Sequence, residues 1–197
     1  MKRTQPIMKP ETKLILILGN LAFLVSLFLD DSVAKLVKSI RSASLDPPFS
    51  LVTDFTSVFL VLMAVTTLFL IQEKNRKYIS LLWAAFALAI ILSYGIKFIV
   101  ARPRPTFELW YPFFQSLYYS FPSMHAAAAF SVLPLLKESL KKTALLWLAF
   151  ALLVSFSRLY FSYHYLSDVI FGAFMGYLIG IFILYFEKKH RFAEKWL

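Results

Sequence analysis

Two of the three histidines in the sequence lie beside groups that suit the transfer of a phosphoryl group. His164 is followed four residues later by Asp168, a spacing that predicts both side chains on one face of a helix. A carboxylate beside one imidazole nitrogen fixes the tautomer and leaves the other nitrogen free to attack or to ligate. In a soluble protein such a pair is more often structural than catalytic, so its surroundings decide its meaning.

His125 lies at the start of another predicted helix, in the sequence Phe-Pro-Ser-Met-His followed by four alanines. Ser123 follows a proline in this segment and is a good N-cap for that helix. The amides of a helix N-terminus are a ready site for an oxyanion or a phosphate. A capped helix start would by itself explain Ser123, but it would not explain the histidine two residues later.

Basic residues complete this set of groups. Lys97 is followed by the segment Arg-Pro-Arg-Pro at 102–105, whose prolines end a helix and force an extended backbone, so that Arg104 projects back towards Lys97. Arg158 precedes His164 by six residues. Cations and amides stabilise charge on phosphoryl oxygens while one imidazole attacks and the other protonates the leaving oxygen. A metal ion fits poorly, because one nearby carboxylate cannot build a magnesium site and the cations would repel the ion.

The elements that must position these groups are membrane helices. Apolar residues make up 59% of the 197 residues and charged residues 16%, against about 45–50% and about 25% in soluble domains. A helix needs about 20 residues to cross the hydrocarbon core. Six apolar stretches are found, of which the first and the fourth are short, and they lie near residues 14–29, 51–71, 78–100, 123–136, 144–160 and 165–186. We therefore predict an all-α polytopic membrane protein, with six transmembrane helices in one bundle and a single domain over residues 1–197.

If these stretches are membrane helices, the polar clusters are stronger evidence of function, and most of the positive charge is explained by topology. An ionisable His–Asp pair inside a membrane is costly unless it has a function. Fourteen of the 21 Lys and Arg residues fall in the segments that share one side with the N-terminus, which predicts that both termini are cytoplasmic. The net charge of +10 therefore gives no reason to expect nucleic acid as a partner. The seven basic residues on the outer side are Lys35, Lys38, Arg41, Lys97, Arg102, Arg104 and Arg158.

Several other features of the sequence carry structural predictions. The first apolar stretch ends without a small-residue cleavage site, so we read it as a retained helix rather than a signal peptide. Basic and apolar residues alternate within the connecting segment 31–50, which predicts either an amphipathic interfacial helix over 33–42 or an ordinary connector. Residues 107–121 contain eight aromatics, typical of an interfacial belt or of a wall for lipid chains. Three glycines at four-residue intervals from 172 to 180 predict close helix packing.

The three polar clusters together resemble the signature of the type 2 phosphatidic acid phosphatase (PAP2) superfamily. The motifs of that family are Lys-x6-Arg-Pro, Pro-Ser-x-His with glycine usual at x, and Ser-Arg-x5-His-x3-Asp. Here they are matched in order by Lys97 with Arg104-Pro105, by Pro122-Ser123-Met124-His125, and by Ser157-Arg158 with His164 and Asp168. The motifs span residues 97–168, and the six-helix layout extends the resemblance over most of the chain.

The resemblance implies a role for each matched residue. His164 would form a phosphohistidine, Asp168 would orient it, and His125 would protonate the leaving group. The phosphate would be held by Lys97, Arg104, Ser123 and Arg158. The family works without a metal, so no cofactor is expected. Arg102 lies outside the motifs and could contact the site from behind or meet a head group, while Met124 replaces the usual glycine and could narrow the pocket.

The expected function is that of a metal-independent lipid phosphatase at the outer face of the cytoplasmic (inner) membrane. Relatives handle phosphatidylglycerol phosphate, phosphatidic acid, undecaprenyl pyrophosphate and the 1-phosphate of lipid A. The expected partners are the lipid substrate and the bilayer, and no obligate protein partner is evident.

Other functions remain open at this point. A lipid-to-lipid phosphotransferase would use the same phosphohistidine. A non-catalytic anion-binding or transport protein would also need internal cations, although the repeated halves common in transporters are not found in this sequence. An intramembrane serine protease built on Ser123 ranks low, because clustered cations are out of place around a peptide bond. Vanadium haloperoxidases share the anion site but are soluble.

Overall fold

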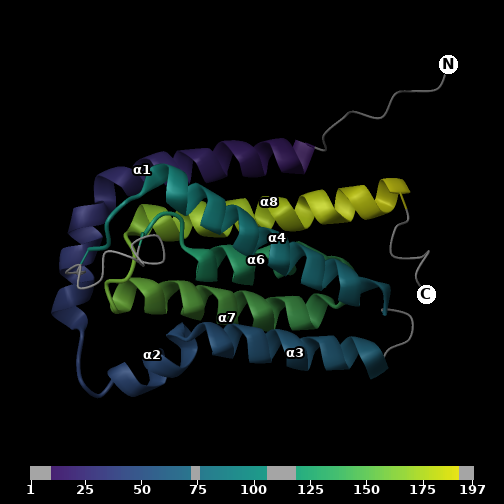
Figure 1. The fold of residues 1–197 in the computed structure, drawn as a ribbon, viewed down its shortest axis with the longest axis horizontal. Helices are drawn as coiled ribbons and strands as arrows, with labels where there is room; N and C mark the ends of the chain where they lie inside the picture. Colours follow the sequence, from purple (N-terminus) through teal and green to yellow (C-terminus); the bar gives the residue numbers. More distant parts are fainter. Residues whose placement is uncertain (1–9, 72–75, 106–118, 191–197) are drawn as a thin grey trace.

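The computed structural model describes residues 10–71, 76–105 and 119–190, and within these ranges all regular structure is helical. The described helices are α1 (Pro10–Ile40), α2 (Asp46–Thr53), α3 (Phe55–Ile71), α4 (Lys77–Val100), α6 (Met124–Ser139), α7 (Lys141–Tyr160) and α8 (Leu166–His190). The long helices run side by side in one bundle (Figure 1), which confirms the all-α prediction for this part of the chain. Residues 106–118, which make up most of the predicted aromatic belt, lie outside the described residues.

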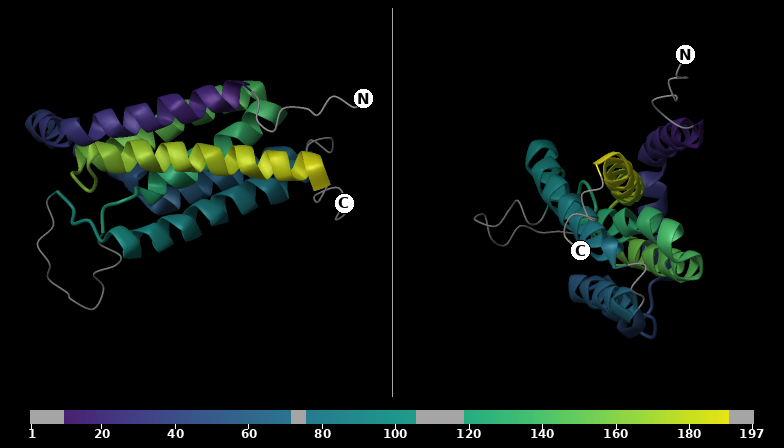
Figure 2. Two further views of the ribbon diagram at one scale, coloured as in Figure 1. Left: turned by 90° about the horizontal axis from the view of Figure 1, so that it is seen from above. Right: turned by 90° about the vertical axis from the view of Figure 1, so that its right-hand side faces the viewer.

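Helix α6 is the centre of the bundle and packs against α8, α4 and α7. Ten of its 16 residues are buried, beginning with the run of alanines at 126–129. A Cβ added at Gly172, Gly176 or Gly180 of α8 would collide with the backbone of α6 or its adjoining N-cap. The predicted close packing through these glycines is therefore confirmed, and its partner is α6. Figure 2 shows α1 and α3 at the outside of the bundle.

The prediction of six full-length spans is not confirmed. Among the described residues, α1, α4, α7 and α8 are long and apolar enough to cross a membrane, and α2 with α3 would make a fifth span bent by 63°. Helix α6 has 16 residues, a rise of about 24 Å, whereas the hydrocarbon core is about 30 Å thick. Because α6 is enclosed by other helices, its ends do not have to reach the head groups themselves.

Helix α1 joins two segments that the sequence analysis treats separately. The first apolar stretch and the proposed interfacial helix form one helix of 31 residues, because neither glycine nor proline occurs between Asn20 and Ile40, where the two segments meet. Towards its C-terminal end α1 bends across the end of the bundle (Figure 1). There Val37 is only 4% exposed, while Lys35 and Lys38 are exposed. Leu36 and Ile40 are also exposed, so the segment is helical, as predicted, but it does not have one buried apolar face and is not a separate helix.

Two local structures set the helix ends near the polar clusters. Asp54 separates α2 from α3, and its carboxylate accepts a hydrogen bond from the amide of Thr56 at 3.2 Å, which caps α3. Ala101 ends α4 in the left-handed conformation with φ of 49°, and its amide donates to the carbonyl of Lys97 at 2.9 Å. The chain turns away from α4 at this point, as the prolines predict. The C-terminus of α4 and the N-termini of α6 and α8 thereby share one end of the bundle (Figure 1).

Candidate active site

A small hollow, partly open to the outside, brings the three predicted clusters together. Its lining consists of Tyr94, Lys97, Arg104, Met124, His125, Arg158 and His164. These residues come from the end of α4 and the segment after it, the start of α6, the end of α7 and the turn before α8. Five predicted site residues and Met124 therefore share one surface, although they are widely spaced in the sequence.

His164 is held by the backbone of Ser120. The imidazole Nδ1 lies 2.7 Å from the carbonyl oxygen of Ser120 and 3.7 Å from Oδ2 of Asp168. Because a carbonyl only accepts, Nδ1 carries the proton of the neutral ring, and Nε2 keeps a lone pair. The prediction that His164 and Asp168 share a helix face is wrong, because α7 ends at Tyr160 and α8 begins at Leu166. Ser162, whose φ is 54°, lies in the turn between α7 and α8.

The surroundings of His164 favour its neutral form. Burial lowers the pKa of His164 well below its ordinary value, and the positive charges of Arg158, Lys97 and Arg104 lower it further. The hydrogen bond to the carbonyl of Ser120 opposes this shift by a smaller amount. A neutral imidazole is the nucleophilic form, so the ring is ready to attack at neutral pH.

Asp168 ties α8 to two neighbouring segments. Its Oδ1 accepts a hydrogen bond from Nη1 of Arg102 at 2.8 Å, and its Oδ2 accepts one from the amide of Tyr165 at 2.8 Å. Its backbone carbonyl accepts from the amide of Ser123 at 3.0 Å, at the start of α6. The side chain is fully buried, and Oδ2 is its oxygen that faces His164.

The segment that leads into α6 is fixed by Lys97 and by the chain after α4. Nζ of Lys97 donates to the carbonyl of Tyr119 at 2.5 Å and to that of Ser120 at 3.4 Å. The amide of Ser120 donates to the carbonyl of Arg102 at 2.7 Å. Lys97 therefore supports the same carbonyl that binds His164, a role that the sequence analysis missed. The only sequence signal for Ser120 is its place just before the Pro-Ser-Met-His motif.

Two of the arginines lie near the same aromatic ring. The guanidinium of Arg158 lies 4.6 Å from the centroid of the Tyr163 ring, and that of Arg104 lies 5.7 Å from the same centroid. Nη1 of Arg158 also donates to the carbonyl and the hydroxyl of Thr53, each at 2.8 Å. The sequence analysis missed Tyr163, Thr53 and the hollow-lining Tyr94. An aromatic residue beside a histidine is too common in this chain to be a signal.

Two predicted phosphate ligands carry polar atoms without a partner among the described residues. These are the hydroxyl oxygen of Ser123 and Nε of Arg158, both buried. Ser123 is the N-cap residue of α6, as predicted, but its side chain makes no capping hydrogen bond. Buried polar atoms without a partner are rare and costly. An oxyanion offers acceptors to both of these groups.

Arg102 turns inward rather than towards a head group. Its guanidinium lies between Asp168 and Asp30, with Nη2 at 2.7 Å from Oδ2 of Asp30. It does not line the hollow. Asp30 is a further residue that was not predicted from the sequence, although an aspartate at the end of an apolar stretch is itself a signal.

The donor set suits an anion. Within residues 10–71, 76–105 and 119–190, no group of three or more His, Cys, Asp and Glu residues is placed to hold a metal ion. The hollow is lined by three cations and two imidazoles, with no carboxylate in its lining. A negatively charged group with several oxygens is the ligand that this lining complements.

Known proteins with similar sequences cover most of the chain. A family model described as the PAP2 superfamily matches residues 77–192. The undecaprenyl-diphosphatase of Sulfolobus acidocaldarius is 31% identical over 174 residues, which are 86% of this chain and 81% of that protein. The bacitracin transport permease protein BcrC of Bacillus licheniformis is 30% identical over 158 residues, 78% of this chain and 77% of that protein.

Two solved structures share the fold. The transmembrane PAP2-type phosphatidylglycerolphosphate phosphatase of Bacillus subtilis superposes with a TM-score of 0.68 at 22% identity, over 89% of this chain and 98% of that one. LpxE of Aquifex aeolicus superposes with a TM-score of 0.65 at 25% identity, over 80% of this chain and 95% of that one.

Proposed function

Because the chain belongs to the PAP2 superfamily, a family that includes membrane lipid phosphatases, we propose that it removes phosphate from a membrane lipid through a phosphohistidine on His164. The observation that carries this proposal is the shared hollow, which brings His164 and His125 together with Lys97, Arg104 and Arg158. Two imidazoles serve as nucleophile and proton donor, and three cations bind the phosphoryl oxygens. No metal ion is needed in these steps.

The first step transfers the phosphoryl group to the protein. The lone pair on Nε2 of His164 forms a bond to phosphorus, and the bond between phosphorus and the leaving oxygen breaks. His125 donates a proton to that oxygen, so the lipid leaves as an alcohol or as a monophosphate. The cations stabilise the charge on the remaining oxygens, and the negative charge of the bound phosphate favours the protonated form of His125.

The second step returns the protein to its starting state. His125, now neutral, removes a proton from a water molecule, and the oxygen of that water forms a bond to phosphorus. The bond between phosphorus and Nε2 of His164 breaks, and inorganic phosphate leaves. Ser120 keeps the proton on Nδ1 throughout, which supports its role in orienting the ring.

We propose a polyprenyl diphosphate as the preferred substrate. The support is the 31% identity to an undecaprenyl-diphosphatase over most of both chains. Phosphatidylglycerol phosphate, phosphatidic acid and lipid A 1-phosphate are the competing substrates. Met124 lines the hollow beside His125, where a leaving group would lie, and its side chain limits the room for a bulky head group.

We also propose one domain over residues 1–197, with both termini in the cytoplasm and the site at the outer face of the cytoplasmic membrane. The support is the distribution of charge. Lys77, Lys141 and Lys188 lie at the end of the bundle opposite the site, where α4 and α7 begin and α8 ends (Figure 1). Basic residues favour the cytoplasmic side of a membrane.

Phosphate release in detergent tests the proposal, with undecaprenyl diphosphate, phosphatidylglycerol phosphate, phosphatidic acid and lipid A 1-phosphate as substrates and with a chelator present. We expect release that the chelator does not reduce, fastest with undecaprenyl diphosphate. Loss of activity in the chelator would contradict the metal-free mechanism. Release from none of the four lipids would contradict the proposed function.

A transport protein is the second candidate, because a relative of 30% identity is named a transport permease. A lipid phosphotransferase is a variant of the first candidate. Adding an acceptor lipid to the assay separates these functions. A transferase passes the phosphate to that lipid, a phosphatase releases it to water, and a permease does neither.

A further inference from the structure

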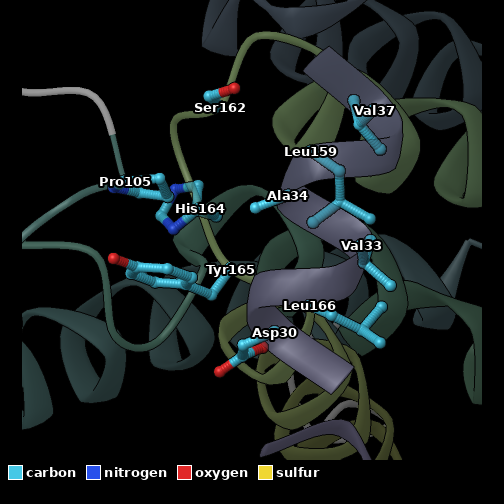
Figure 3. A pocket seen from close by; sticks show the side chains of 10 residues that line it. All are labelled: Asp30, Val33, Ala34, Val37, Pro105, Leu159, Ser162, His164, Tyr165 and Leu166. Atoms are coloured by element: carbon cyan, nitrogen blue, oxygen red, sulfur yellow. The ribbon is translucent and has the colours of Figure 1, made fainter. Parts of the chain in front are cut away.

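Asp30 is a buried carboxylate on a helix that is otherwise mostly exposed. It lies on α1 at 5% exposure, in the part of the helix that passes the turn between α7 and α8. Figure 3 shows Asp30 on the side of α1 where Tyr165 lies. A buried carboxylate is costly unless it is paired and hydrogen-bonded. Its partners therefore indicate why it is there.

The hydrogen-bond partners of Asp30 among the described residues are Ser167, at the start of α8, and Arg102. Oδ1 accepts a hydrogen bond from the amide of Ser167 at 2.8 Å, and Oδ2 accepts one from the Ser167 hydroxyl at 2.6 Å. Oδ2 also accepts from Nη2 of Arg102 at 2.7 Å. Asp30 thus binds the start of α8 directly, one residue before Asp168.

Arg102 connects the carboxylate of Asp30 to that of Asp168. Its Nη1 donates to Oδ1 of Asp168 at 2.8 Å and to the hydroxyl of Ser167 at 2.7 Å. The guanidinium also lies over the ring of Tyr165, at 4.0 Å from the centroid. One planar group with fixed donors is therefore shared between two carboxylates, and its orientation is determined from several sides.

We propose that Asp30 is a positioning residue for His164, acting through Arg102 and Asp168. An isolated guanidinium binds a carboxylate with two parallel hydrogen bonds. Because Nη2 of Arg102 donates its hydrogen bond to Asp30, Arg102 binds Asp168 through Nη1 alone, and the acceptor is Oδ1. Oδ2 stays with the amide of Tyr165 and faces Nδ1 of His164 at 3.7 Å. Without Asp30, Arg102 would donate hydrogen bonds to both carboxylate oxygens of Asp168 and draw that carboxylate away from the imidazole of His164.

This inference rests on the proposed function and predicts a specific kinetic effect. Asp30 does not line the hollow, so the phosphate ligands Lys97, Arg104 and Arg158 keep their places when Asp30 is changed. The loss should therefore appear in kcat, where the orientation of His164 matters, and not in KM. Replacing a residue that orients a reactive group without touching the substrate typically changes activity by about 10- to 100-fold.

The test compares Asp30→Asn with Asp31→Asn in the purified full-length chain, with undecaprenyl diphosphate as substrate. Asp31 is the matched control, because it is the next residue on α1 and is exposed. Asp30→Asn keeps the size of the side chain but loses the charge that Arg102 and Ser167 bind. We expect kcat to fall about 10-fold or more with KM nearly unchanged. Asp31→Asn should match the wild type, and Asp30→Glu, which restores the carboxylate, should recover part of kcat.

A double-mutant cycle separates positioning from general stability. Once Arg102→Gln has broken the connection to Asp168, Asp30→Asn should lower kcat little further, whereas independent effects on the fold would add. Melting temperatures in detergent are measured for each variant. If Asp30→Asn does not fold, Asp30→Glu and Arg102→Gln decide the question by the same split between kcat and KM.

The outcomes distinguish the two proposals. An active wild type, an inactive His164→Ala and an Asp30→Asn variant with unchanged kcat would overturn the role of Asp30 and leave the proposed function intact. A rise in KM that accounts for the whole loss would overturn it too, as would additive effects in the cycle. A wild type that releases no phosphate from any lipid overturns the proposed function and this inference with it.

Discussion

The carbonyl oxygen of Ser120 lies 2.7 Å from Nδ1 of His164, closer than the 3.7 Å that separate this nitrogen from the carboxylate of Asp168. A backbone group therefore fixes the tautomer of the ring, and Asp168 adds its charge from further away. The same segment leads directly to Ser123 and His125 at the start of α6. The proposed nucleophile and the proposed proton donor are thereby held by one short piece of chain.

This arrangement predicts that the loss of Asp168 lowers kcat less than the loss of His164 does. We expect Asp168→Asn to lower kcat about 10- to 100-fold, because Ser120 still holds the Nδ1 proton when the charge is lost. His164→Ala should abolish measurable turnover. His190→Ala is the matched control, since this third histidine is exposed at the end of α8 and should retain full activity. Equal losses for Asp168→Asn and His164→Ala in phosphate release would contradict this order.

The pH profile reports the environment of His164. Its pKa lies well below the ordinary value of about 6.5, and the active form is neutral, so kcat/KM should fall only as the pH drops through that lowered pKa. Arg104 is one of the charges that lower the pKa. Arg104→Gln should therefore raise it and move the acid limb of kcat/KM to higher pH.

The wild type and Arg104→Gln are compared with the same substrate, so that the ionisation of the substrate affects both pH profiles equally. Lys38→Gln removes an exposed charge that does not line the hollow and is not among those that lower the pKa of His164, so it should leave the limb in place. An acid limb that stays at the same pH in Arg104→Gln would contradict the electrostatic account.

The glycines of α8 predict a stability effect. A Cβ at position 176 would collide with the carbonyl oxygen of Ala127 on α6, so Gly176→Ala should destabilise the fold by about 1–3 kcal/mol. Gly95→Ala is the control, because a Cβ at Gly95 of α4 meets nothing within 4 Å. It should leave the melting temperature in detergent unchanged or slightly raised. Equal melting temperatures for the two variants would mean that α6 and α8 pack less closely.

The chain contains no cysteine, so single cysteines report topology without a background. We expect Lys35→Cys to react in intact cells with a maleimide that cannot cross membranes, because Lys35 is exposed at the site end of the bundle. Lys142→Cys, exposed at the start of α7, should react only after the membrane is opened. The reverse pattern would place the site in the cytoplasm.

The sequence predicted the charged and imidazole groups that line the hollow, but of the groups that support them it predicted only Asp168 and Arg102. Lys97, Arg104, Arg158, His125 and His164 could be named because cations and imidazoles are costly near a membrane and therefore stand out. Their supports are backbone carbonyls and side chains of common types. Which of these groups support the site depends on which segments meet in the fold.

Asp30 shows most directly what could not be predicted from the sequence. Two aspartates follow each other at the end of the first apolar stretch, and nothing in the sequence says which of them faces Ser167, 137 residues later. The face that α1 turns towards α8 decides this. The fourth span is not confirmed for a related reason, because length and hydropathy cannot tell that α6 is enclosed by three other helices.

The central claim is that His164 carries the phosphoryl group between the two steps, and trapping that intermediate tests it most directly. The protein is mixed with undecaprenyl diphosphate labelled in its terminal phosphate and quenched in alkali, where phosphohistidine survives. The label is then located by mass spectrometry of the peptides. We expect the label on His164 in the wild type and none in His164→Ala, with His190→Ala labelled like the wild type. Turnover without label on His164, or label on another residue, would contradict the account.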